Sequence, residues 1–284
     1  KQRFLPGIAA GEIHFSIGYT EPSAGTDLAA LTTSAVKHDD HYLVNGNKLY
    51  TSGAEGADYV FLAVRTDPDV PKHKGISILV AETSDPGFSR GDIHTMGGVH
   101  TNVTYYENVK VPLDMIIGAE NAGWRLITEQ LNHERIGLAA WGIQGWKIFR
   151  DVMNWVHDTK GADGQRVIDN PGAQRNLAEV YAHLEAMRVM NARMSWQLDQ
   201  EEMSPVFPSA IKVYSTEIIL EICRLLMDVV GPHSLIAGDS EGAVLYGNLE
   251  HEYRRATINT FGGGVVEVLR GLVATHGLGM PQHR

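Results

Sequence analysis

The sequence predicts an α+β fold, with a central antiparallel β domain followed by a C-terminal bundle of long helices. From residue 12 to residue 115, short apolar segments alternate with turns rich in Gly, Pro, Asn and Asp, at the spacing of a small barrel or sandwich. After Pro112 the apolar period changes from two to 3.6 residues, and the periodic segments become long. Long amphipathic segments with short connections are typical of a helical bundle.

The β segments are short and separated by turn residues. We expect strands over residues 12–19, 59–65, 76–81 and 103–111, with weaker alternation over 28–37. Two further β-prone segments flank Asn45-Gly46, a pair that tolerates the positive φ angles of a type I′ turn. The sequence therefore predicts a hairpin whose turn is Asn45-Gly46.

The first long helix, expected over residues 119–158, carries one apolar stripe with members three or four residues apart. These members are Trp124, Ile127, Leu131, Leu138, Trp141, Ile148, Val152 and Trp155. Between Leu131 and Leu138 the same stripe contains Glu134, so a carboxylate lies on the face predicted to be buried. Burial raises the pKa of a carboxyl group toward the range of a useful general base. A purely structural ion pair of Glu134 with Arg135 or another cation explains the same position equally well.

Further helices follow over residues 173–198, 208–230 and 241–256, and again after the glycine run 262–264. Residues 1–11 read as the tail of a longer protein, and we place the β domain at 12–117 and the helical bundle at 118–284.

The composition excludes several classes of protein. The 284 residues are 43% hydrophobic and 20% charged, which is ordinary for a globular protein, and the net charge of −10 offers no basic face for nucleic acid. A single cysteine, Cys223, allows no disulfide within the chain, which fits a reducing cytoplasm. Because no apolar run approaches about 18 residues, we expect a soluble cytoplasmic protein with no membrane partner.

Familiar nucleotide, hydrolase and zinc motifs do not occur in the sequence. His133-Glu134 and His251-Glu252 lack the second histidine of HExxH, so we predict no metal site. What remains is a loop, Thr20 to Asp27, that offers backbone N–H groups and hydroxyls without bulk. This chemistry suits a pyrophosphate or the edge of a flavin.

Several motifs, taken together and in order, resemble the acyl-CoA dehydrogenase family over almost the whole chain. They are TEPSAGTD, GNKLYTSGAEGADY, KGISILVAE, PGFS, ENVKVP, ENAGW and EVLR. The GNKLYTSGAEGADY segment is similar to the family pattern G-x-K-x-x-I-T-N-x-x-x-A-D. The resemblance implies an N-terminal helical domain before the β domain and the bundle. This domain is largely missing from the sequence, and residues 1–11 are its end. It also implies FAD as cofactor and the oxidation of acyl-CoA thioesters to trans-2-enoyl-CoA.

The resemblance further implies a set of cofactor-binding residues, namely Tyr19, Thr20, Gly25, Thr26, Leu49 and Thr51. In this assignment Thr20 and Thr51 contact the flavin ring, and Gly25 and Thr26 lie near the phosphates or the CoA. Leu49 falls where many members have Trp.

The catalytic base departs from the commonest family pattern. Many members carry a glutamate where this chain has Gly263, but the branch that includes isovaleryl-CoA dehydrogenase carries its base in an L-x-x-E-R run. Residues 131–135 read Leu-Asn-His-Glu-Arg. The resemblance thus implies Glu134 as catalytic base and Arg135 as the residue that orients it. Because helix-borne bases in this family accompany branched or bulky acyl chains, the resemblance also implies such a substrate, for which the glycine run 262–264 would leave room.

Two family motifs that bind the FAD of a neighbouring subunit are altered. Residues 160–164 replace R-x-x-F-G and residues 228–232 replace Q-x-x-G-G, with loss of an arginine fork and gain of an acid and a proline. We therefore expect an α₂β₂ hetero-oligomer with a homologous acyl-CoA dehydrogenase subunit, similar to the actinobacterial enzymes that shorten steroid side chains. The resemblance also implies that electrons pass to an electron-transfer flavoprotein. Two alternatives stay open: an oxygen-using acyl-CoA oxidase, and a non-catalytic scaffolding subunit.

Overall fold

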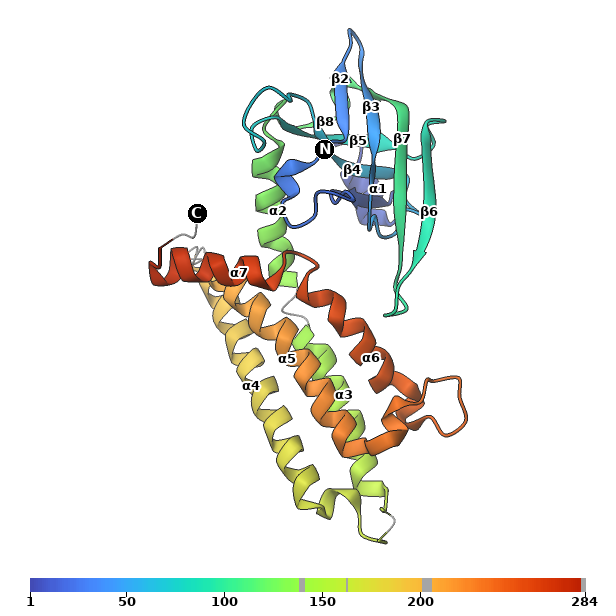
Figure 1. The fold of residues 1–284 in the computed structure, drawn as a ribbon, viewed down its shortest axis with the longest axis vertical. Coiled ribbons are helices and arrows are strands. Elements are labelled where there is room, and N and C mark those ends of the chain that lie inside the picture. The colour runs from blue at the N-terminus through green and yellow to red at the C-terminus, as the bar shows by residue number, and fades with distance from the viewer. Residues whose placement is uncertain (138–140, 162, 201–205, 282–284) are drawn as a thin grey trace. The chain divides into compact units, whose positions relative to one another are not determined.

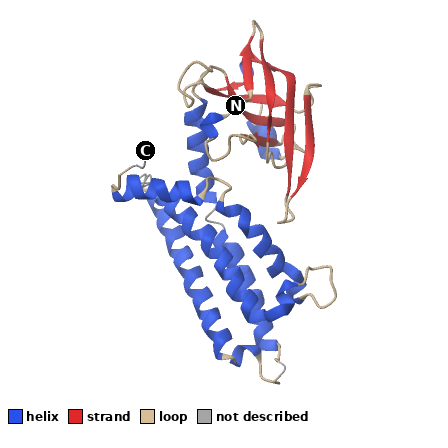
Figure 2. Ribbon diagram, in the orientation of Figure 1, coloured by secondary structure: helices blue, strands red, loops and turns tan. Residues whose placement is uncertain are grey.

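The computed structural model describes residues 1–137, 141–161, 163–200 and 206–281. A short helix, α1 (Leu5–Ala10), has Pro6 in its first turn and ends at Gly11, whose φ is +72°. The strands that follow are β1 (Phe15–Gly18), β2 (Ser34–Lys37), β3 (His41–Lys48), β4 (Tyr59–Arg65), β5 (Ile76–Glu82), β6 (Phe88–His94), β7 (His100–Pro112) and β8 (Ile116–Ile117). Figures 1 and 2 show these strands gathered in one part of the chain and long helices in the other.

The described strands form one eight-stranded sheet in the order β6-β7-β3-β2-β4-β5-β8, with β1 paired to β4. Most neighbours are antiparallel, as predicted, but β1 runs parallel to β4, and Ser34 of β2 forms a parallel pair with Arg65 of β4. The sheet is therefore mixed. Its core contains alternating side chains such as Val44, Leu62 and Val109, each fully buried.

The prediction of a hairpin turn at Asn45-Gly46 was wrong. β3 runs without interruption through both residues, and its register with β7 shifts between Val44 and Gly46, which is a β-bulge. The glycine is needed there because its φ is +147° and a Cβ on Gly46 would lie 2.7 Å from the Thr33 Cα. The real hairpin joins β2 to β3, closed by a 2.8 Å bond from the His38 N–H to the His41 carbonyl. A positive-φ residue thus served a bulge and not a turn.

The helices after the sheet are α2 (Gly123–Gly137), α3 (Trp141–Asp158), α4 (Pro171–Asp199), α5 (Phe207–Val230), α6 (Asn248–Ala256) and α7 (Val266–Leu272). α5 packs against α3, α4, α6 and α7, and its core with α3 and α4 includes Val152, Leu184 and Ile222. The single helix predicted over 119–158 is described as α2 and α3. Residues 138–140 between them, with stripe member Leu138, lie outside the described residues.

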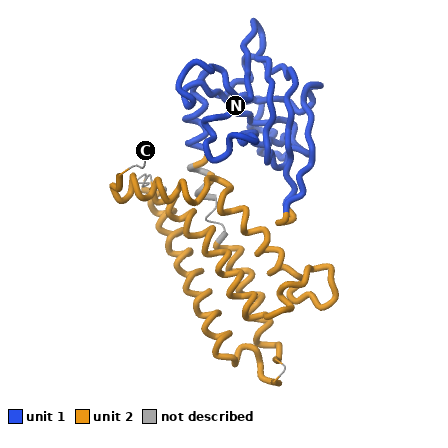
Figure 3. Tube along the Cα trace, in the orientation of Figure 1, with its two compact units in different colours: residues 1–95, 99–130 blue, residues 96–98, 131–284 orange. Residues whose placement is uncertain are grey.

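Clustering of contacts divides the chain into two compact units (Figure 3). The β unit comprises Lys1–Thr95 and Val99–Gln130, and the helical unit comprises Met96–Gly98 and Leu131–Arg284. The division falls inside α2, later than the predicted boundary at 117/118. None of the helices described here is both long and apolar enough to cross a membrane.

Candidate functional site

A buried ion pair anchors the loop that follows β1. Glu21 Oε1 lies 2.8 Å from Lys48 Nζ, and both side chains are almost completely buried. The Glu21 carboxylate also accepts hydrogen bonds from the Thr32 N–H at 2.7 Å, the Thr32 hydroxyl at 2.8 Å and the Thr33 N–H at 2.8 Å. Because all of these donors point at one carboxylate, the loop and the end of β3 are held together from inside the unit.

The pKa values of both members of this pair are strongly shifted. Burial by itself raises the pKa of Glu21. The positive charge of Lys48 and the hydrogen bonds from Lys48, Thr33 and Thr32 outweigh burial and lower the pKa to about 2. Burial lowers the pKa of Lys48 to about 8, even though Glu21 favours its charged form. Near neutral pH both groups are charged, so the pair contributes an attraction that a neutral substitute lacks.

Two of the predicted cofactor residues, Tyr19 and Thr20, are connected directly to the end of β3. The Tyr19 carbonyl accepts a 3.0 Å hydrogen bond from Lys48 Nζ, and the Thr20 carbonyl accepts a 2.8 Å bond from the Leu49 N–H. The Tyr19 side chain is buried, with its ring centroid 6.2 Å from that of Phe61. The structure therefore brings Tyr19, Thr20 and Leu49 together as neighbouring backbone segments.

Thr51 lies in the same region, but its side chain points into the β unit. It is fully buried, and its hydroxyl shares a 3.2 Å hydrogen bond with the Thr104 hydroxyl. Its neighbours Tyr50 and Ser52 are exposed. The Tyr50 backbone adopts a φ of +59°, and the Ser52 hydroxyl lies 3.0 Å from that of Thr101. Counting the family pattern from Gly46 puts its I-T-N on residues 51–53, a signal that points to Ser52 and that the sequence assignment missed.

Gly25 and Thr26 lie on the exposed part of the loop. The loop doubles back in a tight turn, with the Glu21 N–H 3.0 Å from the Ala24 carbonyl and the Ala24 N–H 3.2 Å from the Glu21 carbonyl. A Cβ on Gly25 would meet only Thr20 Cγ2, at 3.6 Å. Exposed hydroxyls and main chain on a rigid, buried support form a donor set that fits the phosphates and ring edge of a flavin nucleotide.

Glu134 belongs to the helical unit, on the second half of α2. Ile127 of the predicted stripe is fully buried, whereas the side chain of Glu134 is exposed in this chain. The predicted burial of Glu134 was therefore wrong for the chain by itself, because Glu134 lies beyond Gln130, where α2 leaves the β unit. The backbone of Arg135 is helical, but its side chain lies outside the described residues.

The glycine run 262–264 forms the turn between η7 (Thr257–Thr260) and α7. Gly263 and Gly264 adopt φ angles of +68° and +110°, which favour glycine. Lys212 of α5 is fully buried, and its ammonium donates to the carbonyl of Thr260 at 3.3 Å and to that of Gly264 at 2.5 Å. Lys212 thus binds the main chain at both ends of the turn, and the motif comparison did not identify this residue.

The two altered motifs also lie in the helical unit. In the first, the nearest arginine is Arg166, and its guanidinium forms a bidentate pair with Asp169, with both N···O distances 2.9 Å. In the second, Asp228 pairs with Arg224 at 3.3 Å, and Gly231 ends α5 with a φ of +75°. In both segments the charged side chains pair with neighbours in the sequence. The family pattern has instead an arginine in the first segment and a glutamine in the second, which contact the FAD of a neighbouring subunit.

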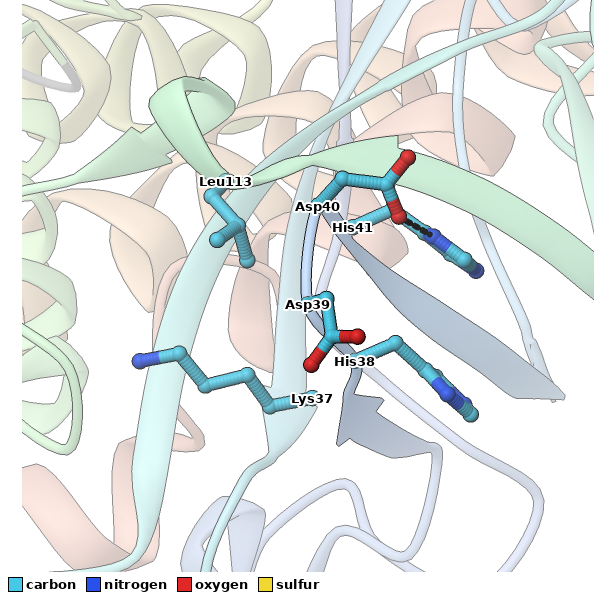
Figure 4. A pocket seen from close by; sticks show the side chains of 6 residues that line it. All are labelled: Lys37, His38, Asp39, Asp40, His41 and Leu113. Atoms are coloured by element: carbon cyan, nitrogen blue, oxygen red, sulfur yellow. Dashed lines mark hydrogen bonds and ion pairs between the residues drawn. The ribbon is translucent and has the colours of Figure 1, made fainter.

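A shallow hollow lies at the β2–β3 turn, lined by Lys37, His38, Asp39, Asp40, His41 and Leu113 (Figure 4). Its Asp40 carboxylate lies 2.6 Å from the His41 ring nitrogen, and the rings of His38 and His41 stack. It contains none of the predicted site residues. Among the described residues, no group of three or more His, Cys, Asp or Glu could hold a metal ion.

Comparison with known proteins decides the family. Residues 16–109 match the model described as acyl-CoA dehydrogenase, middle domain, and residues 121–278 match acyl-CoA dehydrogenase, C-terminal domain. This chain belongs to the acyl-CoA dehydrogenase family. The fold class and the family predicted from the sequence are thereby confirmed, and this acyl-CoA dehydrogenase is an enzyme of a flavoprotein family that generally uses FAD.

Its relatives include heteromeric enzymes. It is 46% identical to "Acyl-CoA dehydrogenase FadE26" of Mycobacterium tuberculosis, over 99% of this chain and 72% of the relative. Among solved structures, this acyl-CoA dehydrogenase is similar to "Tcur3481-Tcur3483 steroid ACAD", with 48% identity and a TM-score of 0.95 over 99% of this chain and 72% of that one. It is also similar to a chain of the ChsE4-ChsE5 complex from Mycobacterium tuberculosis, with 47% identity and a TM-score of 0.94 over 99% and 73% of the two chains.

Proposed function

We propose that this acyl-CoA dehydrogenase is the FAD-dependent catalytic subunit of a hetero-oligomer that forms the 2-enoyl-CoA from a branched or bulky acyl-CoA, with a steroid side chain as the favoured class. The observation that carries the proposal is a pair of positions. A carboxylate, Glu134, lies on α2 in the L-x-x-E-R run, and a glycine, Gly263, occupies the place of the more common base.

Glu134 acts as the general base and removes the proton from the α-carbon of the thioester. Its exposure leaves the carboxylate within reach of an acyl group, so the role rests on the L-x-x-E-R run and no longer on the predicted burial. Arg135, the next residue, orients the carboxylate or tunes its charge. The bound FAD supplies the acceptor for the β-hydrogen, which leaves as hydride.

The residues proposed to hold FAD come from the β unit. Thr20 and Ser52 present hydroxyls to the flavin ring, with Ser52 in place of Thr51, because the Thr51 hydroxyl is buried against Thr104. Gly25 and Thr26 take the phosphates or the CoA. Tyr50, 58% exposed, replaces Leu49 as the wall beside the ring, since it is the aromatic side chain at the surface of this segment.

A homologous partner completes the site from the other side. Arg166 is committed to Asp169, and Asp228 adds a negative charge where a pyrophosphate is expected, so this chain is poorly equipped to serve a neighbour's FAD. Copies of one chain in a closed assembly need both halves of the site on every copy. The two-component complexes among the similar structures support the same arrangement. We propose an α₂β₂ assembly in the cytoplasm that passes electrons to an electron-transfer flavoprotein.

FAD content tests the proposal. The full-length chain is purified alone and after co-expression with a homologous acyl-CoA dehydrogenase subunit, and FAD is measured by absorbance after denaturation. We expect little FAD in the chain alone and one FAD per two chains in the complex. One FAD per chain without a partner contradicts the shared site. Rapid peroxide formation by the reduced complex in air assigns it instead to the oxidases.

A further inference from the structure

Lys212 is a buried charged residue of the helical unit, and neither the motifs nor the proposed mechanism assigns it a role. It lies near the start of α5, its side chain is fully buried, and Ile211 and Ile219 of the same helix are buried too. A buried ammonium is strongly unfavourable unless hydrogen bonds replace its water. Its bonds to the carbonyls of Thr260 and Gly264 meet this need.

The two carbonyls enclose the glycine turn. Thr260 is the last residue of η7, and Gly264 is the third glycine, so one ammonium connects the start and the end of the turn. Between them, Gly263 and Gly264 have positive φ angles, a conformation that glycine adopts without strain but does not by itself enforce. The Gly262 N–H donates to the Ile258 carbonyl at 2.9 Å, which fixes the start of the turn, and the bond from Lys212 to Gly264 fixes its end.

One ion pair joins α5 to α7 beyond the turn. Arg270 of α7 pairs with Glu217 of α5 at 2.5 Å, but the arginine side chain is 56% exposed and the pair is screened by solvent. Lys212 makes its bonds in the interior, where displacement of either carbonyl leaves a buried charge with fewer partners. Of these two polar contacts, only that of the buried lysine reaches the turn itself.

We propose that Lys212 is a positioning residue that fixes the glycine turn 262–264 and thereby sets how large an acyl group this enzyme accepts. The inference rests on the proposed function, in which this turn borders the space left by the absent glutamate at position 263. A turn held rigidly open admits a bulky acyl group in one orientation, whereas a relaxed turn fills the same space with its own main chain.

The test uses Lys212→Met, which keeps the length of the side chain and removes its donors, in the complex with the partner subunit. Lys212→Arg retains the charge and donors, and Lys147→Met is the control, because Lys147 is exposed on α3 and pairs with Asp151 at 3.6 Å. Binding of a steroid side-chain acyl-CoA and of isobutyryl-CoA is followed by the change in flavin absorbance, and kcat/KM is measured for both.

We expect Lys212→Met to weaken binding of the bulky acyl-CoA, and lower its kcat/KM, by roughly tenfold to a hundredfold, with little change for isobutyryl-CoA. Lys212→Arg restores part of the preference, and Lys147→Met leaves it unchanged. Equal losses for both substrates, or no loss, overturn the inference. Gly264→Ala distorts the turn with Lys212 intact, so it provides the test if Lys212→Met does not assemble: an unchanged preference also overturns the inference.

The binding measurement separates this inference from the proposed function. If the wild-type complex binds both acyl-CoAs but oxidises neither, the proposed function fails while the ratio of the two dissociation constants still reports on Lys212. If the complex oxidises both and the ratio does not respond to Lys212→Met or Gly264→Ala, the inference fails by itself.

Discussion

Glu21 and Lys48 lie 27 positions apart in the sequence, yet their charged atoms are 2.8 Å apart in the interior of the β unit. The pair joins the loop after β1 to the last residue of β3, the two segments that carry Tyr19, Thr20 and the residues following Lys48. A buried pair of this kind is strongly destabilising to break, because the remaining charge stays buried without its partner. The proposed flavin-binding surface therefore rests on an internal electrostatic contact.

Replacement of Lys48 by Met should lower the free energy of unfolding by about 3–5 kcal/mol, because Glu21 then remains buried without its cation. The double variant Glu21→Gln, Lys48→Met should lose much less than the sum of the single variants. Urea unfolding of the full chain measures both. Lys37→Met serves as control, since Lys37 pairs with Glu120 at the surface, and it should change stability far less. Additive single effects contradict this account.

The free energy of unfolding should fall at acidic pH, and protonation of Glu21 should account for part of this loss. Its folded-state pKa of about 2 lies below the ordinary 4.5, so its contribution is present above pH 4.5 and is lost as the pH falls through 2. The full contribution is about 3 kcal/mol, of which about 2 kcal/mol is lost by pH 3. Urea unfolding at several pH values between 7 and 3 tests this. The double variant should lose correspondingly less, and identical pH profiles for the two proteins would rule out the assignment.

Replacement of Glu134 by Gln should lower turnover of the complex by about 10²–10⁴-fold, because the shape is kept and the base is lost. FAD content and acyl-CoA binding should stay close to wild type. Glu129→Gln is a matched control on the same helix, where Glu129 lies 3.8 Å from Arg125 at the surface. Unchanged turnover in Glu134→Gln would instead assign the chemistry to the partner and make this chain a scaffold.

Removal of the Ser52 hydroxyl and removal of the Thr51 hydroxyl, both in the segment after β3, should have different effects. Ser52→Ala should weaken FAD binding to the complex by roughly fivefold to tenfold, the value of about one hydrogen bond. Thr51→Val should leave FAD binding unchanged and lower the free energy of unfolding by about 1 kcal/mol, because it removes the bond to Thr104. Flavin titration and urea unfolding of both variants measure these effects. If Thr51→Val weakens FAD binding and Ser52→Ala does not, Thr51 is the residue that contacts the flavin.

Replacement of Gly46 by Ala should destabilise the β unit by about 2 kcal/mol or more. The φ of Gly46 is +147°, and a Cβ there would lie 2.6 Å from Thr33 Oγ1 and 2.7 Å from Thr33 Cα. Gly56→Ala is the control, because a Cβ on Gly56 would meet no atom within 4 Å and the φ of this residue is outside the strained range. Equal melting temperatures for the two variants would argue against a strained bulge.

The sequence by itself determined the fold class, the family, most strand and helix positions, and Glu134 as the candidate base, because periodicity and short motifs are local properties of the chain. β4, predicted at 59–65, has those bounds in the structure, and α5 begins one residue before its prediction. Ser52 was within reach of the sequence too, through the count of the motif from Gly46.

Only the tertiary structure decided what the isolated polar residues do. It assigned Gly46 to a bulge opposite Thr33, paired Glu21 with Lys48, turned Thr51 inward and placed the Lys212 ammonium under the glycine turn. It also left Glu134 exposed where the stripe predicted burial. Each of these outcomes depends on which distant segment packs against the residue, and burial and hydrogen-bond partners arise from that packing and not from the local pattern.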